Sequence, residues 1–248
     1  MKLLLIIDDY LPESTKVGAK MMHELAIELK NNGHEISVLT PKSTQSELLS
    51  VQKIDGINVM FFKSGRIKNV RKIKRAFNES LLSYRAFKSA KKFLKENTHH
   101  GIIYFSPSIF FGSLVKKLSS LWNCKSYLIL RDIFPQWAVD NKLLKENSLP
   151  YIYFKFFEKI NYQAANKIGV MSQSNLDFFK LKNINTSKFE VLYNWSKIDD
   201  VKVEDCGFRK KLKLENKIVL FYGGNIGHAQ QMINLINLAK KFIKNSYV

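Results

Sequence analysis

Short apolar runs alternate with amphipathic stretches along most of this 248-residue chain. The run over residues 2–7 is apolar on both faces, which is typical of a strand inside a parallel sheet. Comparable runs predict six further strands, at residues 35–40, 57–62, 102–105, 126–130, 167–171 and 189–193.

Helical periodicity fills the intervals between these strands. Residues 19–32 carry apolar positions spaced i, i+3, i+4, i+7, and Gly33 follows where a helix end favours a left-handed residue. Residues 66–96 predict one long helix or two abutting ones. Further helices are expected over 106–122, with Ser108 as a possible N-cap, and over the aromatic-rich stretch 149–166. Strands alternating with helices predict an α/β fold, a Rossmann-like, doubly wound parallel sheet.

A second unit of this kind begins near the end of the sequence. Residues 217–231 read KIVLFYGGNIGHAQQ, which predicts a strand at 218–222, a glycine turn and a helix whose apolar pattern starts at Met232. Backbone amides at such a turn and the positive end of the helix dipole attract phosphate groups. We therefore predict a first domain over 1–195, a polar linker over 196–216, and the start of an incomplete second domain over 217–248.

The charge of the chain is strongly positive. Lys and Arg number 40 against 21 Asp and Glu, a formal net charge of +19. Such an excess favours a polyanionic partner, either nucleic acid, an anionic membrane surface or a phosphorylated ligand, with a lysine-rich solvated surface as the alternative.

Cations crowd the start of the predicted helix at 66–96. They oppose the helix dipole, so local helix stability does not explain them. Either they form a solvated face, or they form an anion- or membrane-facing patch with apolar neighbours that enter the interface. The residues of this patch are Arg71, Lys72, Lys74 and Arg75.

The sequence favours a reducing compartment. Cys124 and Cys206 are far apart, the apolar run at the start is shorter than a signal peptide core, and no run approaches the roughly 20 residues that span a bilayer. We therefore expect a cytoplasmic protein, peripheral on the inner face of the cytoplasmic membrane. The aromatic residues of 149–166 belong either to the core or to a headgroup layer.

Three loops that follow predicted strands have unusual content, and two of them gather charged side chains. The loop 8–18 contains Asp8, Asp9 and Glu13, and Asn194–Trp195 follows the last strand of the first domain. The third loop, 131–140, contains Arg131, Asp132, Trp137 and Asp140. Because ligands bind beyond the carboxyl ends of parallel strands, this placement favours a binding site over a solvated surface.

Competing motifs fit poorly. GGNIG is not GxGxxG, and no GxxxxGK[ST] is present, so neither a nicotinamide nor a P-loop site is predicted. His99 and His100 have no partner at metal-ligand spacing, so no metal site is expected. His23 and His34 have the positions of helix-surface and turn histidines and receive no role.

Four segments together resemble a known family. They are YLPESTKVGAKMMHELAIELKNNGHEISVLTP, RDIFPQWAVD, VLYNW and VLFYGGNIGHAQQM. Their content and order resemble the retaining GT-B glycosyltransferases of bacterial O-antigen and capsule assembly, the family 4-like, fucosamine-type transferases in particular. The resemblance covers essentially the whole chain, and RDIFPQWAVD is its most specific part. It implies two Rossmann-like domains, a UDP-linked nucleotide sugar held mainly by the second, a polyprenyl-diphosphate-linked acceptor held by the first, and no metal or other cofactor.

The resemblance also implies roles for individual residues. Gly18 on one side and Gly224, Asn225 and Gly227 on the other would line the donor diphosphate. Asp132 and Glu13 are candidates for positioning the acceptor, and no nucleophile or general base is assigned. Several positions depart from the family. Where relatives often have a diphosphate-neutralising Arg and Lys, this chain has Asn225 and Gln230, so charge compensation is weaker or comes from elsewhere. Gln231 replaces a frequent glycine, and Phe105–Ser106 occupies the place of a frequent histidine.

Two other functions are compatible with the sequence. The chain reads as truncated in its donor domain, so it could be an inactive fragment or an acceptor-binding subunit that needs a separate donor-domain protein. A nucleic-acid-binding module is favoured by the charge alone, without any recognised motif, and we expect no nucleic acid partner.

Overall fold

The computed structural model describes residues 1–248 except 68–69, 197, 199–205, 225, 228–229 and 243–248. It contains two compact units, Met1–Lys197 and Ile198–Val248, and each is described by itself.

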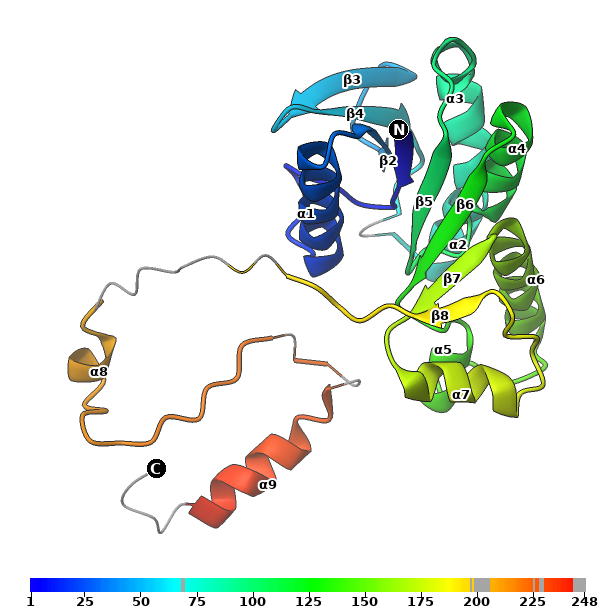
Figure 1. Ribbon diagram of the computed structural model, residues 1–248. Helices are drawn as coiled ribbons and strands as arrows, with labels where there is room; N and C mark the ends of the chain where they lie inside the picture. Colours follow the sequence, from blue (N-terminus) through cyan, green and yellow to red (C-terminus); the bar gives the residue numbers. More distant parts are fainter. Residues whose placement is uncertain (68–69, 197, 199–205, 225, 228–229, 243–248) are drawn as a thin grey trace. The chain divides into compact units, whose positions relative to one another are not determined.

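The first unit is built on one eight-stranded sheet (Figure 1). Its strand order is β3-β4-β2-β1-β5-β6-β7-β8. All neighbours are parallel except β3 and β4, and in the centre Leu4 of β1 pairs with Ser37 of β2 and Ile102 of β5. The predicted Rossmann-like sheet and its seven predicted strands are confirmed as β1 (Lys2–Ile6), β2 (Glu35–Lys42), β4 (Ile57–Lys63), β5 (Gly101–Ser106), β6 (Lys125–Leu130), β7 (Lys167–Val170) and β8 (Phe189–Val191).

The sequence analysis missed the edge strand β3 (Leu49–Ile54), which runs antiparallel to β4. The two strands are joined at Asp55 and Gly56, with φ of 49° and 77°. Asp-Gly is the sequence typical of a two-residue hairpin turn with positive φ at both positions. Most of β3 is solvent-accessible and lacks a continuous apolar run, so the strand itself gave no pattern. The Asp-Gly dipeptide was the sequence feature that could have indicated the hairpin.

Helices cover both faces of the sheet. α1 (Val17–Asn31) packs on one face, and α3 (Leu82–Glu96), α4 (Gly112–Trp122) and α6 (Leu149–Ala164) pack on the other (Figure 1). The stretch 66–96 forms two helices, α2 (Lys72–Ser80) and α3. The remaining helices of the unit are α5 (Gln136–Asp140) and α7 (Gln173–Leu181).

The expected N-cap at Ser108 is wrong. α4 begins later, at Gly112, and the Ser108 hydroxyl accepts a 3.4 Å hydrogen bond from the amide of Phe110 in the preceding loop. Ser148 caps α6 by accepting the amide of Tyr151.

Alternate residues of β1, together with Ile7 directly after it, enter two separate cores. Leu4 and Ile6 pack with α3 and α4, whereas Leu5 and Ile7 pack with α1. Each such fully buried side chain stabilises the fold by about 2 kcal/mol. In α6, Phe154 and Phe157 pack against the first core, but Phe156 on the same helix is exposed, so the aromatic helix is only partly core.

The buried His99 predicts an acid-sensitive fold. It lies against Trp122 with ring centroids 4.8 Å apart, and burial, aided by Lys2, lowers its pKa from 6.5 to about 4. As the pH is lowered, His99 is protonated in the unfolded chain before it is protonated in the folded protein. The free energy of unfolding therefore decreases as the pH drops from 6.5 toward 4, by up to about 3 kcal/mol from this group. Chemical denaturation across this pH range should show a shallower decline for His99→Phe than for the wild type; parallel declines would contradict the assignment.

The second unit contains α8 (Phe208–Lys211) and α9 (Ile233–Phe242), and none of its described residues is buried. The predicted helix is confirmed as α9, but the predicted strand at 218–222 is wrong: these residues form no strand, and Phe221 is 89% exposed. A strand needs a neighbour for its backbone groups, and no described strand pairs with this segment. Among the residues with a described placement, no helix combines the length and the apolar character needed to cross a membrane.

Candidate functional site

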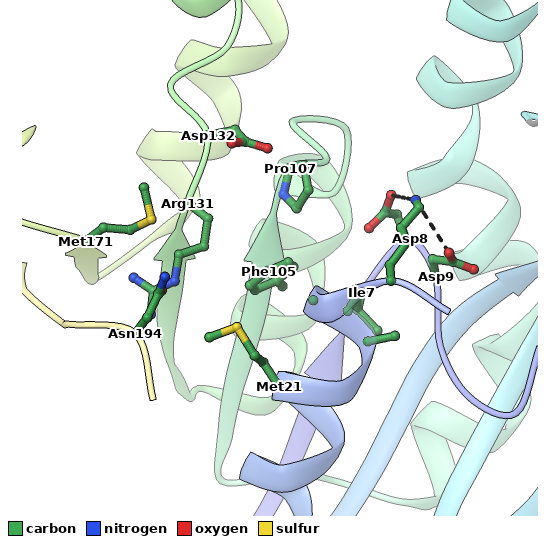
Figure 2. A pocket seen from close by; sticks show the side chains of 13 residues that line it. Ile7, Asp8, Asp9, Met21, Phe105, Pro107, Arg131, Asp132, Met171 and Asn194 are labelled. Carbon is green, nitrogen blue, oxygen red and sulfur yellow. Dashed lines mark ion pairs between the residues drawn. The ribbon is translucent and has the colours of Figure 1, made fainter. Parts of the chain in front are cut away.

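The strands that follow β1 are added toward one edge of the sheet, and the strands from β5 onward are added toward the other edge. From β1 the chain passes through α1 to β2 on one side, and the later crossover through α2 and α3 leads to β5 on the other side. At such a point the carboxyl ends of the strands leave a crevice. A pocket of about 230 Å³ lies there, which we call the switch pocket (Figure 2). Its walls include Asp8, Asp9, Lys16, Gly18, Phe105, Arg131, Asp132 and Asn194.

One side of the switch pocket carries carboxylates. Asp8 and Asp9 follow β1, and the Lys16 ammonium lies 3.8 Å from the Asp8 carboxylate and 3.4 Å from that of Asp9 (Figure 2). The Ser14 hydroxyl also donates to Asp9, at 2.8 Å. Burial raises the pKa of Asp8; Lys16 opposes this rise and Asp9 adds to it. The protein around Asp8 therefore favours its protonated form more than water would.

The first turn of α1 forms the floor between the two sides. Its N-cap, Lys16, makes no side-chain capping bond, and the Lys16 carbonyl accepts the amides of Ala19 and Lys20. The turn therefore presents the amides of Val17 and Gly18 together with a positive dipole end. A Cβ on Gly18 would lie 2.8 Å from Cε1 of Phe105. Glycine is therefore needed for the helix to pack closely against this ring, and Gly18 lines the pocket wall.

The opposite side carries Arg131, which is 8% exposed. Its Nη1 donates to the Leu192 carbonyl at 2.7 Å and its Nη2 to the Tyr193 carbonyl at 3.4 Å. The guanidinium lies 5.2 Å from the ring centroid of Trp195, whose Nε1 donates to the Met21 carbonyl of α1. These contacts connect the loop that begins at Arg131 with the segment 192–195, and Trp195 connects that segment with α1.

The loop 131–140 is only partly in the site. Asp132 lines the switch pocket at its exposed rim, and the protein around its carboxyl raises its pKa through desolvation. Asp140 accepts a 2.8 Å bond from Gln136 within α5, and neither it nor Trp137 lines the pocket.

A second pocket, of about 320 Å³, adjoins the first, and we call it the lateral pocket. The two share Asp8 and Asp9. Glu13 lines the lateral pocket, and its carboxylate lies 2.7 Å from the Lys42 ammonium, which also sits over the Phe61 ring. The two acceptor-positioning candidates, Asp132 and Glu13, therefore face different pockets.

The expectation that His23 is a helix-surface residue is wrong. His23 is buried; its Nδ1 lies 2.8 Å from the Tyr10 hydroxyl and its Nε2 2.9 Å from the Asp55 carboxylate. The β3–β4 turn, which carries Asp55, covers this part of α1. The bridge ties the loop that carries Asp8 and Asp9 to the edge hairpin.

The basic patch is a solvent-facing surface. Arg71, Lys72, Lys74 and Arg75 are all exposed, and Arg75 pairs with Glu79 at 2.9 Å. Apolar side chains lie among them, Ile73 at 87% and Phe77 at 62% exposure. We call these six residues the α2 surface.

The remaining predicted site residues belong to the second unit. Gly224 and Gly227 are exposed and precede α9 rather than lying at its first turn. Asn225 lies outside the described residues. The site geometry is therefore that of the first unit, with Gly18 as its glycine.

Fold and pocket together define a class: a Rossmann-like α/β protein with a pocket at the switch point of its sheet. Sucrose-phosphate synthase from Thermosynechococcus elongatus superposes with a TM-score of 0.72 at 12% identity, over 98% of this chain and 60% of that one. Anabaena Alr3699/HepE, solved with UDP and glucose, gives 0.62 at 12% identity, over 97% and 58%.

Among curated proteins, the chain is similar to "Probable glycosyltransferase WbjE" of Pseudomonas aeruginosa, with 25% identity over 124 residues. The match covers 49% of this chain and 31% of WbjE. No family model matches the sequence. The chain thus spans about a third of its curated relative and about three fifths of the two solved structures.

Proposed function

We propose that this chain takes part in glycosyl transfer from a UDP-linked nucleotide sugar. The observation that carries the proposal is the switch pocket, in which carboxylates and a buried cation flank the open first turn of α1. A sugar presents hydroxyls, which bond carboxylates, and its leaving diphosphate needs positive charge and amide donors. The similarity to WbjE and the fold of HepE, a protein solved with UDP and glucose, support the same function.

In this proposal the residues act by binding and orientation. The α1 amides near Gly18 face the diphosphate, and Gly224, Asn225 and Gly227 keep the donor-binding role predicted from the sequence. Either Asp132 in the switch pocket or Glu13 in the lateral pocket positions the acceptor. The acceptor oxygen bonds the anomeric carbon as the bond from that carbon to the diphosphate breaks, and the acceptor proton passes to the leaving phosphate, with retention of configuration. No metal or other cofactor takes part.

The acceptor in this proposal is a sugar linked to a polyprenyl diphosphate, in O-antigen or capsule synthesis. The α2 surface supports this, since exposed cations with interspersed Ile73 and Phe77 suit an anionic membrane. The protein would then lie on the inner face of the cytoplasmic membrane.

Calorimetric titration of the full chain with UDP and UDP-sugars tests the donor assignment. We expect dissociation constants between about 1 µM and 1 mM, the usual range for enzyme substrates. Saturable binding of oligonucleotides with a steep salt dependence, without donor binding, would instead indicate a nucleic-acid-binding protein.

Gly18→Val should weaken UDP binding by about tenfold or more, because its Cβ would displace Phe105 into the pocket. Val17→Ala is the matched control, since Val17 is exposed on the same turn. Equal affinities in the two variants would remove Gly18 from the donor site.

A second candidate is an acceptor-binding subunit that a separate donor-domain protein completes. The exposed apolar segment at 218–222 favours it, because such residues are normally covered. Absence of donor binding, together with strong binding of a hydrophobic dye that Phe221→Lys reduces, would support this candidate over the first.

A further inference from the structure

Arg131 is a buried cation that has no acidic partner in the part of the chain that the structure describes. A guanidinium has five N–H donors, and the carbonyls of Leu192 and Tyr193 account for two of them. Its Nε has no acceptor among the described residues, and no carboxylate contributes to its electrostatic surroundings. Figure 2 shows the Asp132 carboxylate directed away from it.

Such a charge is costly to bury. Removing an ion from water costs several kcal/mol unless an opposite charge compensates it, and carbonyl dipoles and the Trp195 ring compensate only in part. Lys16, the other described cation in the pocket wall, is already occupied by Asp8 and Asp9. The Arg131 side of the pocket therefore lacks one negative charge.

The first turn of α1 points independently to the same ligand. It lines the switch pocket with an N-cap that makes no side-chain bond, at the start of a 15-residue helix. Open amides at a helix start bind anions. A buried cation and a helix N-terminus thus meet in one pocket, about the carboxyl ends of β1 and β6.

We propose that Arg131 supplies, from the first unit, the positive charge that holds the diphosphate of the nucleotide donor in the switch pocket. The assignment rests on the proposed function for the identity of the anion.

Arg131 also holds the segment 192–195 in place, so the test must separate charge from positioning. Arg131→Lys keeps the charge and loses the paired hydrogen bonds to the Leu192 and Tyr193 carbonyls, whereas Arg131→Gln keeps an amide donor and loses the charge. Lys116→Gln is the matched control, because it removes one exposed charge from α4, outside the switch pocket. A background of Trp122→Phe and Trp137→Phe leaves Trp195 as the single tryptophan and as a fluorescence reporter of local structure.

The probes are inorganic pyrophosphate and UDP, titrated into the full chain at low salt. We expect Arg131→Gln to lose about tenfold or more in affinity for both, with a shallower salt dependence and unchanged Trp195 emission. Arg131→Lys should stay within about threefold of the wild type, as should Lys116→Gln.

Several results would overturn the assignment. The first is an affinity of Arg131→Gln equal to that of the wild type, and the second is a loss of affinity in Lys116→Gln as large as in Arg131→Gln. The third is a loss as large in Arg131→Lys, accompanied by a shift of the Trp195 emission. The fourth is the absence of pyrophosphate binding by the wild type. Pyrophosphate binding that depends on Arg131, without binding of any UDP-sugar, would uphold the anion site and contradict the proposed donor.

Discussion

Replacing Arg71, Lys72, Lys74 and Arg75 together by Glu is expected to abolish binding of the protein to anionic liposomes. Each cation near a negatively charged membrane contributes about 1 kcal/mol, so the loss of four corresponds to about a thousandfold in affinity. The reversed charges then add repulsion. Co-sedimentation at low salt, with vesicles of phosphatidylglycerol and of phosphatidylcholine, measures the effect.

The position of these residues makes the test specific. All four are exposed, and the exposed Ile73 and Phe77 between them are available to enter the lipid. Ile73→Ser with Phe77→Ser should therefore weaken binding while retaining its salt dependence. The matched control reverses four exposed lysines elsewhere, Lys116, Lys125, Lys182 and Lys210.

Arg75 calls for one additional variant. Its charge acts on Asp8 of the switch pocket, so a triple variant that keeps Arg75 separates membrane binding from effects on the pocket. If the quadruple variant binds anionic vesicles as the wild type does, or if the control binds equally weakly, the α2 surface is not the membrane contact.

Gly112→Ala is expected to destabilise the first unit by about 3 kcal/mol, a decrease in Tm of roughly 10 °C. A Cβ there would lie 2.6 Å from Cα and 2.7 Å from N of Asn161, and 2.8 Å from the carbonyl carbon of Ile160. These are backbone atoms of α6, which cannot rotate away, so α4 and α6 would have to separate. Thermal and urea unfolding measure the loss.

Two controls isolate the clash. Gly33→Ala introduces a side chain at φ +81° with no atom within 4 Å of it, so only the backbone conformation is penalised, by about 1 kcal/mol. Ser113→Ala, at the exposed next position of α4, should leave the Tm unchanged. If the Tm of Gly112→Ala equals or exceeds that of Gly33→Ala, α4 and α6 move apart readily and the predicted clash is contradicted.

Local pattern explains what the sequence analysis predicted well. The central strands are buried on both faces, so their continuous apolar runs identify them without knowledge of their neighbours. β3 was missed for the opposite reason, since an edge strand with solvent on one side has no such run. The segment at 218–222 has the apolar run but forms no strand, because pairing depends on a partner that no local pattern specifies.

Local pattern likewise explains which residues of the site could be predicted from the sequence and which could not. Strand ends followed by charged residues indicated Asp8, Arg131 and Asp132 as members of a site, because carboxyl ends of parallel strands share one edge. His23 was misjudged, since its burial depends on the β3–β4 turn about thirty residues away in the chain. Glu13 and Asp132 line different pockets, which is decided by the packing of the folded chain and not by the spacing of the two residues in the sequence.

The sequence by itself determined the sheet, the helices between its strands, and the edge where charged loops collect, because hydrophobic periodicity and turn residues act over a few neighbours. Only the tertiary structure decided which of those charges are buried, paired or open to a ligand. Burial and pairing depend on side chains that lie far apart in the chain, and the contact of Arg131 with Leu192, Tyr193 and Trp195 is such a case.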